Sequence, residues 1–166
     1  ILLYQKLLKR ITIMIKVNVF SEEKSWSKKL KKKEIFFNRI FKNFPKKFRF
    51  INKKVYLTLL LSNNKKIKIL NKKFRNKNKH TDVLSFPFDQ KKQMSKEVYL
   101  GDIIISFNYI NKPKNLTNKV FKEKTIKIFI HGFLHLLGYD HIKDKDYEKM
   151  FIKEQKIFNS LKKILY

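Results

Sequence analysis

Three histidines in the C-terminal third of the chain have the spacing of metal ligands. His131 and His135 are four residues apart in an apolar stretch that predicts a helix, so their side chains share one helix face and can bind one ion. Gly138 can adopt the left-handed conformation that ends a helix, after which the chain can bring His141 to the same point. Only four histidines occur in the chain, and three lie within residues 131–141, which indicates a metal site.

Such a triad predicts hydrolytic chemistry at one zinc ion. Three neutral imidazoles leave the full charge on the ion and leave a coordination position open. A water at that position has a pKa near about 7, which provides a nucleophile at neutral pH. Three histidines also suit nickel or copper, so the sequence leaves the identity of the metal open.

The pattern H-x-x-x-H-x-x-G-x-x-H also matches the metzincin proteases, which place a glutamate directly after the first histidine. That glutamate is the general base that activates water for attack on the peptide bond. This chain has Gly132 at the position. A metzincin-like metalloprotease is therefore an alternative, but this chain lacks the glutamate that would accept the proton.

Several cations could bind a phosphodiester beside this metal. Arg75 is one of four arginines in a chain with 41 basic residues, and its planar fork can bind phosphate through two hydrogen bonds. The same fork can stabilise charge that develops at phosphorus, although a surface ion pair would also explain an arginine. Lys124 and Lys127 precede His131 on the predicted helix, and they either attract a phosphodiester or are simply solvated.

The carboxylates near these elements have more than one interpretation. Asp82 and Asp102 interrupt apolar strands, where a charge is costly unless it is paired, so we expect them to fix loops or orient neighbours. Asp140 either accepts a hydrogen bond from a ligand or stabilises the turn before His141. Glu154 falls on the apolar stripe of the last predicted helix, where it can pair with a ligand histidine or with a lysine.

Composition limits the class of protein. A chain of 166 residues and 20.3 kDa predicts one domain. The net charge of +28 predicts attraction to nucleic acid or to an anionic membrane, although a bias towards lysine, isoleucine, asparagine and phenylalanine explains part of it. The absence of cysteine excludes disulfides and thiolate metal sites, and it suits a reducing compartment such as the cytoplasm. No segment reaches the about 18 consecutive apolar residues of a membrane span.

The helices and strands expected from the sequence, which must position these residues, indicate an α+β fold. We expect a single layered domain over residues 14–166, with a mixed sheet of about four strands covered by helices. The central buried helix carries the metal ligands. Residues 1–13 are interpreted as an extension without chemistry. The predicted strands are 14–20, 54–61, 81–86 and 98–106. The predicted helices are 21–43, with Ser21 as its cap, a short helix after Asn63 or Asn64, 117–137, and a last helix from Asp144 or Asp146 to Leu161.

The segment HGFLHLLGYDH at residues 131–141 resembles the signature of the YbeY family, the bacterial rRNA maturation factor also described as a single-metal endoribonuclease. Two further blocks resemble the family, in the family's order, and the resemblance covers roughly residues 14–160. The first comprises LNKKFR at 70–75 and TDVLSFP at 81–87, and the second is LGDIIIS at 100–106. Phe74 replaces the usual tyrosine, and His80, which could add an imidazole near the site, replaces the usual proline.

The resemblance implies that His131, His135 and His141 bind one Zn²⁺ ion and that Arg75 is needed for activity. We therefore expect Arg75 and His131 to be catalytic residues of a cytoplasmic endoribonuclease that prefers single strands. The implied role is late maturation of the 16S rRNA 3′ end and ribosome quality control. The implied partners are rRNA and the small ribosomal subunit, with ribosomal or assembly proteins. The alternative is a ribosome-assembly factor whose metal is mainly structural.

Overall fold

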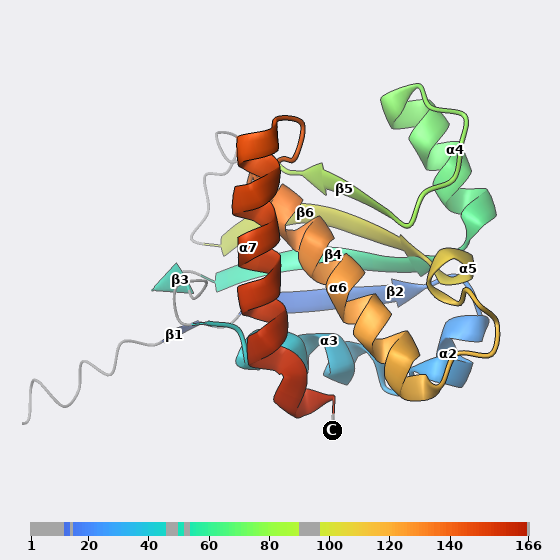
Figure 1. Cartoon of the computed structure of the whole chain (residues 1–166), viewed down its shortest axis with the longest axis horizontal. Coiled ribbons are helices and arrows are strands. Elements are labelled where there is room, and N and C mark those ends of the chain that lie inside the picture. The colour runs from blue at the N-terminus through green and yellow to red at the C-terminus, as the bar shows by residue number, and fades with distance from the viewer. Residues whose placement is uncertain (1–11, 14, 46–49, 52–53, 90–96, 166) are drawn as a thin grey trace, which may run out of the picture.

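A computed structural model describes residues 12–13, 15–45, 50–51, 54–89 and 97–165. Its centre is a mixed four-stranded sheet in the order β2-β4-β6-β5, in which β2, β4 and β6 are parallel and β5 is antiparallel to β6 (Figure 1). The strands are β2 (Lys16–Ser21), β4 (Lys54–Ser62), β5 (Val83–Pro87) and β6 (Glu97–Ser106). The predicted α+β fold with a mixed sheet is confirmed, and each predicted strand agrees to within two residues.

Helices cover both faces of this sheet. They are α2 (Ser25–Lys29), α3 (Lys33–Lys42), α4 (Asn64–Arg75), α5 (Phe107–Ile110), α6 (Asn118–Leu136) and α7 (Asp144–Leu161), followed by the 3₁₀ helix η3 (Lys162–Ile164). The helices α3, α6 and α7 lie over one face, and α4 packs on the other face against β5 and β6 (Figure 1). Among the described residues, no helix has both the length and the apolarity to cross a bilayer.

A short strand pair lies outside the main sheet. The strand β1 (Thr12–Ile13) pairs antiparallel with β3 (Phe50–Ile51). The predicted extension of residues 1–13 lies largely outside the described residues, so its lack of chemistry stays a prediction. Met14, expected to open the first strand, is also outside them.

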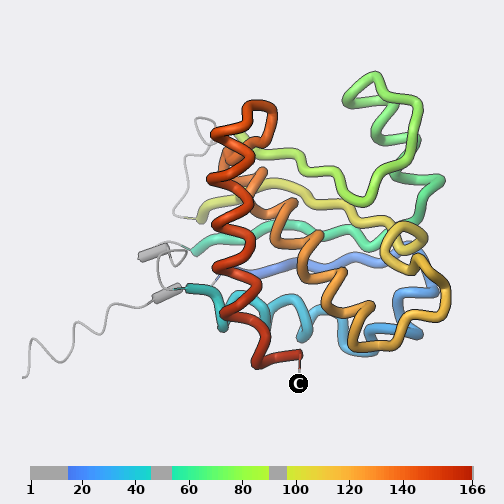
Figure 2. Tube along the Cα trace, in the orientation of Figure 1, coloured from blue at the N-terminus to red at the C-terminus, as the bar shows by residue number. Residues whose placement is uncertain are grey.

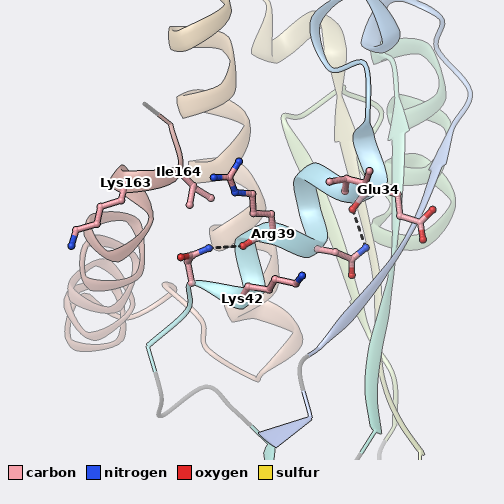
Figure 3. Close-up of a pocket in the computed structure, with 8 residues that line it drawn as sticks. Glu34, Arg39, Lys42, Lys163 and Ile164 are labelled. Atoms are coloured by element: carbon pink, nitrogen blue, oxygen red, sulfur yellow. Dashed lines mark hydrogen bonds between the residues drawn. The ribbon is translucent and has the colours of Figure 1, made fainter.

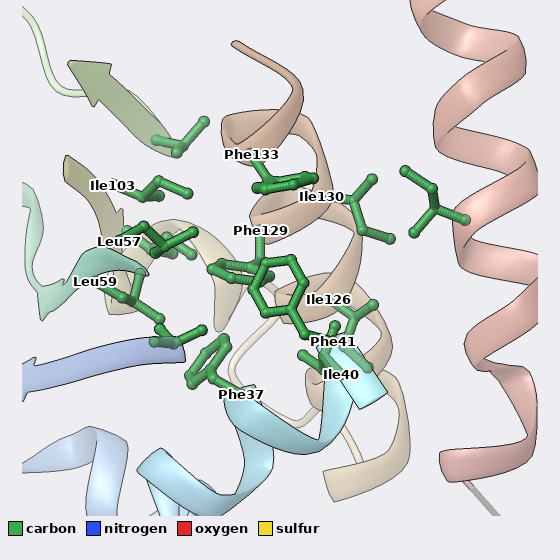
Figure 4. Close-up of a cluster of buried hydrophobic side chains, with 14 of the residues drawn as sticks. Phe37, Ile40, Phe41, Leu57, Leu59, Ile103, Ile126, Phe129, Ile130 and Phe133 are labelled. Carbon is green, nitrogen blue, oxygen red and sulfur yellow. The ribbon is translucent and has the colours of Figure 1, made fainter. Parts of the chain in front are cut away.

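The main core fixes α6 on the sheet. Alternate residues of β4 point into this core, and they are Val55, Leu57, Leu59 and Leu61. Aromatic rings join α3 to α6, with Phe37 and Phe129 at a centroid distance of 5.0 Å and Phe41 and Phe133 at 5.0 Å (Figure 4). Because these rings are almost completely buried, they fix the rotation of α6 and hence the direction of the side chains at its C-terminal end.

The predicted helix 21–43 is wrong, because the chain forms two helices there. Ser21 is the last residue of β2 rather than a cap, and Leu30 ends α2 in an extended conformation with φ −129° and ψ 90°. Trp26 and Leu30 are both buried, which ties this short helix to the core. A continuous helix would also place Lys28 beside Lys32, a like-charge i,i+4 pair that destabilises a helix.

Helical spacing of apolar residues predicts buried stripes that include Ile35 in the helix 21–43, Phe74 in the short helix, and Tyr147 and Phe151 in the last helix, but these four residues are exposed. Of the stripe predicted for the helix 21–43, Ile40 and Phe44 are buried as expected, but Ile35 is 62% exposed. Phe37 and Phe41 are buried although the prediction left them out. A sequence pattern gives the period of a helix, but packing decides which of several apolar residues face the core.

Gly101 lies inside β6, and a glycine within a strand pattern predicts a bulge or a close backbone approach, which the structure confirms. Its φ is +129°, and a Cβ atom there would lie 2.1 Å from the carbonyl oxygen of Phe86 on β5. The register of β4 with β6 also shifts between Tyr56 and Thr58, opposite this position. Only glycine fits here, and it allows β5 to lie against β6 at the edge where the candidate site is found.

Candidate metal centre

The end of α6 turns the chain back onto itself. Gly138 has φ +82°, its N–H donates to the carbonyl of His135 at 3.0 Å, and the N–H of Tyr139 donates to the carbonyl of Leu134 at 3.1 Å. This pair of hydrogen bonds is the Schellman motif, which ends a helix with a left-handed residue. The chain then returns along α7, so the end of α6 and the start of α7 lie together (Figure 2). The predicted role of Gly138 is confirmed.

The turn brings three imidazole rings to one point. One potential ligand nitrogen from each of His131, His135 and His141 lies within 4.8 Å of the other two. The ring centroids are 4.7, 5.2 and 5.0 Å apart, and the Nε2 atoms of His131 and His135 are 3.1 Å apart. The three histidines are therefore close enough to hold a metal ion, as their spacing predicts.

Hydrogen bonds orient two of the rings. The Nδ1 of His135 lies 2.9 Å from the carbonyl oxygen of Tyr139, and a carbonyl only accepts, so this nitrogen carries the proton and donates. The Nδ1 of His131 lies 2.7 Å from Oε1 of Glu154, an acceptor when ionised. In the neutral rings, both Nε2 atoms then present lone pairs to each other, an arrangement that a shared cation stabilises. The donor set therefore fits a metal ion.

The electrostatics of His135 favour the form that binds metal. Burial lowers the pKa of His135, and the neighbouring ring of His131 lowers that pKa further, while the hydrogen bond to Tyr139 opposes both effects. A lowered pKa keeps the imidazole neutral at pH 7. Only a neutral imidazole can act as a ligand, so His135 does not need to lose a proton before it binds an ion.

A pocket of about 890 Å³ joins the histidines to Arg75 around the edge of the sheet. Arg75 is the last residue of α4, on the face of the sheet opposite α6, and its Nη2 donates to the carbonyl of Ser85 on the edge strand β5 at 3.3 Å. This hydrogen bond holds one arm of the guanidinium at the strand. Lys77 also lines the pocket, although no sequence pattern distinguished it from the other lysines.

Gly132 faces the sheet rather than the pocket. A Cβ atom there would lie 3.0 Å from Oγ of Ser85 and 3.1 Å from methyl groups of Val83 and Ile103, and Ser85 donates to the carbonyl of Gly132 at 3.0 Å. The absence of a side chain lets α6 approach β5 and β6 closely. A carboxylate at this position would be forced between helix and sheet, so this backbone has no place for the metzincin base.

Carboxylates near the site hold backbone turns and neighbouring side chains. Oδ1 of Asp82 accepts from the hydroxyl of Thr81 and from the N–H of Val83, both at 2.8 Å, and so fixes the start of β5. Asp140 accepts from the N–H of His141 at 2.7 Å, which agrees with the turn-stabilising interpretation. Asp102 accepts from the hydroxyl of Tyr99. Burial, together with that contact, raises the pKa of Tyr99 to about 12.

Two lysines and one histidine that the sequence suggested for the site lie away from the pocket. Lys124 donates to the carbonyl of Lys112 at 2.5 Å, and the Nζ of Lys127 lies 4.8 Å from the ring centroid of Phe158. His80 is exposed and is not among the residues that line the pocket. Neither Lys124 nor Lys127 lines the pocket, so the structure does not bring them to the metal site, and a role for them in binding a phosphodiester stays a prediction. Their helix face turns towards α7 and the preceding loop.

The contact between Glu154 and His131 predicts that Glu154 supports zinc binding. Because its carboxylate orients His131 and makes the ring more basic, we expect Glu154→Ala to weaken zinc affinity about 10–100-fold, as loss of such partners does in other metal sites. Glu154→Gln keeps a hydrogen-bond acceptor without the charge, so its affinity should lie between the wild type and Glu154→Ala. Titration with zinc against a competing chelator measures this. Unchanged affinity in Glu154→Ala would show that Glu154 does not support a ligand.

Comparisons with known proteins agree with one another. The family model described as "Endoribonuclease YbeY" matches residues 18–162. A protein of Pelagibacter ubique named Endoribonuclease YbeY is 61% identical over 149 residues, covering 90% of this chain and 97% of that protein. A protein of the same name from Persephonella marina is 38% identical over 109 residues, covering 65% of this chain and 71% of that protein. A solution structure of a Thermotoga maritima protein aligns over 89% of both chains, with a TM-score of 0.52 and 29% identity.

Proposed function

The chain belongs to the endoribonuclease YbeY family, and from this premise we propose that it is a zinc-dependent endoribonuclease that cleaves single-stranded RNA. Family membership confirms the resemblance of the sequence blocks and makes the chain an RNA-cleaving hydrolase. The observation that carries the zinc-dependent mechanism is the presence of three convergent histidines and one arginine in a single pocket.

His131, His135 and His141 would hold the ion. When bound there, zinc acts as a Lewis acid and lowers the pKa of a coordinated water towards about 7. Glu154 and the carbonyl of Tyr139 keep the protons of His131 and His135 on Nδ1, which leaves Nε2 free as a ligand.

Arg75 would bind the phosphate whose ester bond is broken. Its hydrogen bond to Ser85 fixes one arm of the guanidinium, and its remaining N–H donors can face the non-bridging oxygens of a phosphate in the pocket. Charge grows on these oxygens in the transition state, where a permanently charged planar donor stabilises it more than it stabilises the substrate. We expect Arg75 to act on kcat more than on binding.

The finer choice of substrate follows from the family. We propose the 3′ end of 16S rRNA as the RNA, rRNA and the small ribosomal subunit as partners, with ribosomal or assembly proteins, and the cytoplasm as the place of action. Ribosome quality control is part of the same proposal. The net charge of +28 supports an RNA substrate, because phosphate contacts supply most of the affinity of proteins for nucleic acids.

Two alternatives agree less well with the site. A structural zinc site surrounds its ion with four protein ligands, whereas the triad in the described residues offers three and His141 is exposed. This geometry favours an ion that is open to substrate over the mainly structural metal of an assembly factor. A metalloprotease would need its general base at Gly132, where the backbone leaves no space.

Metal removal tests the proposed function. Protein purified without added metal should contain close to one zinc per chain by elemental analysis, and it should cleave the single-stranded parts of a structured rRNA fragment. A chelator should abolish this cleavage, because a triad open to solvent releases its ion, and one equivalent of zinc should restore it. Casein should remain intact throughout. Cleavage that resists complete metal removal would contradict the proposed mechanism.

A further inference from the structure

The pocket that joins the three histidines to Arg75, which we call the catalytic pocket, has few lining cations of its own. Arg75 and Lys77 line it, but Asp82 and Asp140 balance them, so a bound ion would be the main positive charge there. Affinity for RNA grows with the number of phosphates that cations neutralise. The pocket can therefore position one phosphate, but it offers few of the cations that would hold a long RNA.

The positive charge gathers at another surface, formed by the end of α2, the turn after it and α3. Two adjoining cavities of about 710 and 490 Å³ lie between the end of α2 and the turn after it, α3, the start of α6 and η3. They share Ile35, Arg39 and Ile164, so they form one groove, which we call the α3 groove. Figure 3 shows its first part, in which Arg39 and Lys42 come from α3 and Lys163 comes from the C-terminal segment.

Cations make up half of the lining of the α3 groove, whereas they make up a quarter of the whole chain. Those in the lining are Lys28, Lys29, Lys31, Lys32, Arg39, Lys42, Lys122 and Lys163. Among the lining residues, all of which the structure describes, Glu34 is the one acidic residue. A lysine-rich composition alone predicts lysines spread over the surface, so their concentration along one groove is a separate observation.

The side chains of the α3 groove suit a polymer rather than a single anion. Arg39 lies where the two cavities meet, and its side chain extends towards Ile164 (Figure 3). Ile35 is 62% exposed beside these cations, so it offers an apolar contact for a base or a ribose. Cations at several points along a groove with apolar contacts between them match the features of surfaces that follow a single-stranded backbone.

The α3 groove is remote from the metal centre. Glu154 contacts His131 in the middle of α7, and Ile164 lies ten residues further on, about 15 Å along a helix axis. An RNA strand with its scissile phosphate beside Arg75 must extend over several nucleotides before it reaches Arg39. A short RNA held in the catalytic pocket would therefore not contact the α3 groove.

We propose that the α3 groove binds the phosphate backbone of the substrate RNA outside the cleaved segment, as a second binding surface. This inference rests on the proposed function, because it takes RNA as the substrate. The groove supplies phosphate contacts that the catalytic pocket, with two lining cations, cannot supply along a long RNA, and the pocket supplies the chemistry. It follows that the groove distinguishes long RNA from short RNA.

A matched pair of triple variants tests the α3 groove. Arg39→Gln, Lys42→Gln and Lys163→Gln together remove three exposed cations of the groove. Lys16→Gln, Lys65→Gln and Lys68→Gln remove the same charge from exposed positions outside both the groove and the catalytic pocket. Both sets are combined with His131→Ala, so that binding of a long single-stranded RNA is measured without cleavage. Thermal unfolding confirms that each variant is folded.

The groove variant should bind the long RNA about tenfold or more weakly than the control variant. Its plot of log Kd against log salt concentration should be less steep by about 2, because each lost phosphate contact on a single strand contributes about 0.7. With His131 restored, cleavage of a short RNA should stay within about twofold of the wild type, because only the pocket holds it.

Equal losses in the groove variant and the control variant would overturn the proposal, because they would show an effect of net charge alone. Unchanged binding of long RNA by the groove variant would overturn it as well. If the wild type binds RNA through the α3 groove but never cleaves it, the proposed function fails while the binding surface stands. The two inferences can therefore be separated.

Discussion

His131→Ala is expected to lower RNA cleavage by more than about 100-fold and to release the metal. Loss of a residue that merely orients a ligand costs about 10–100-fold in metal affinity or activity, and this substitution removes the ligand itself. It also leaves the carboxylate of Glu154 without the imidazole that it contacts at 2.7 Å. Elemental analysis and a cleavage assay on the same sample measure both losses.

His80→Ala is the matched control for this prediction. It also removes one imidazole, but His80 is exposed and does not line the catalytic pocket. Zinc content and cleavage should both stay within about twofold of the wild type, since surface substitutions away from special features change little. Cleavage by folded His131→Ala at the rate of the wild type would point to a contaminating nuclease and would contradict the proposed mechanism.

The fold was predictable wherever one short stretch of sequence determines the outcome. Alternation over residues 54–61 predicts a strand with one buried face, and β4 has that strand and that face. Thr117 begins α6 by accepting a hydrogen bond from the N–H of Val120, and Gly138 ends the helix turn with a positive φ. Caps and strand alternation are properties of neighbouring residues, so a single sequence carries them.

The fold was not predictable where distant segments compete. The predicted helix 21–43 is split because Trp26 is anchored in the core, where its indole N–H donates to the carbonyl of Ser62 on β4. No pattern within residues 21–43 carries information about this partner. The position of α4 on the opposite face of the sheet from α6 likewise depends on strand order, which sequence periodicity does not determine.

In the candidate site too, the features set by neighbouring residues were predictable, and those set by distant segments were not. The spacing of the three histidines was sufficient to predict their convergence, because a helix and its cap fix all three. Arg75 needed the family resemblance, since the edge strand β5 separates α4 from α6 and only the fold brings Arg75 to the same pocket. Lys124 and Lys127 show the limit of helical spacing, because they lie on α6 with the ligands yet contact other partners.

Arg75→Gln should lower kcat for RNA cleavage by about 10²–10³-fold, or about 2.7–4 kcal/mol, while zinc content stays unchanged. Arg75 donates to Ser85 and does not contact the histidines, so its loss should leave the metal in place. Arg75→Lys keeps the charge but loses the planar fork, so its rate should lie between those of the wild type and Arg75→Gln. Steady-state kinetics on a short RNA, with zinc measured in the same samples, tests both.

Lys72→Gln is the control that separates the effect of Arg75 on kcat from the effect of removing any positive charge from α4. Lys72 is exposed on the last turn of the same helix and does not line the catalytic pocket, so its loss should change kcat by less than about twofold. Equal losses in Lys72→Gln and Arg75→Gln would assign the effect to charge alone. Loss of zinc from Arg75→Gln would instead make Arg75 a structural support of the pocket, because a group that acts on the phosphate leaves the ligands intact.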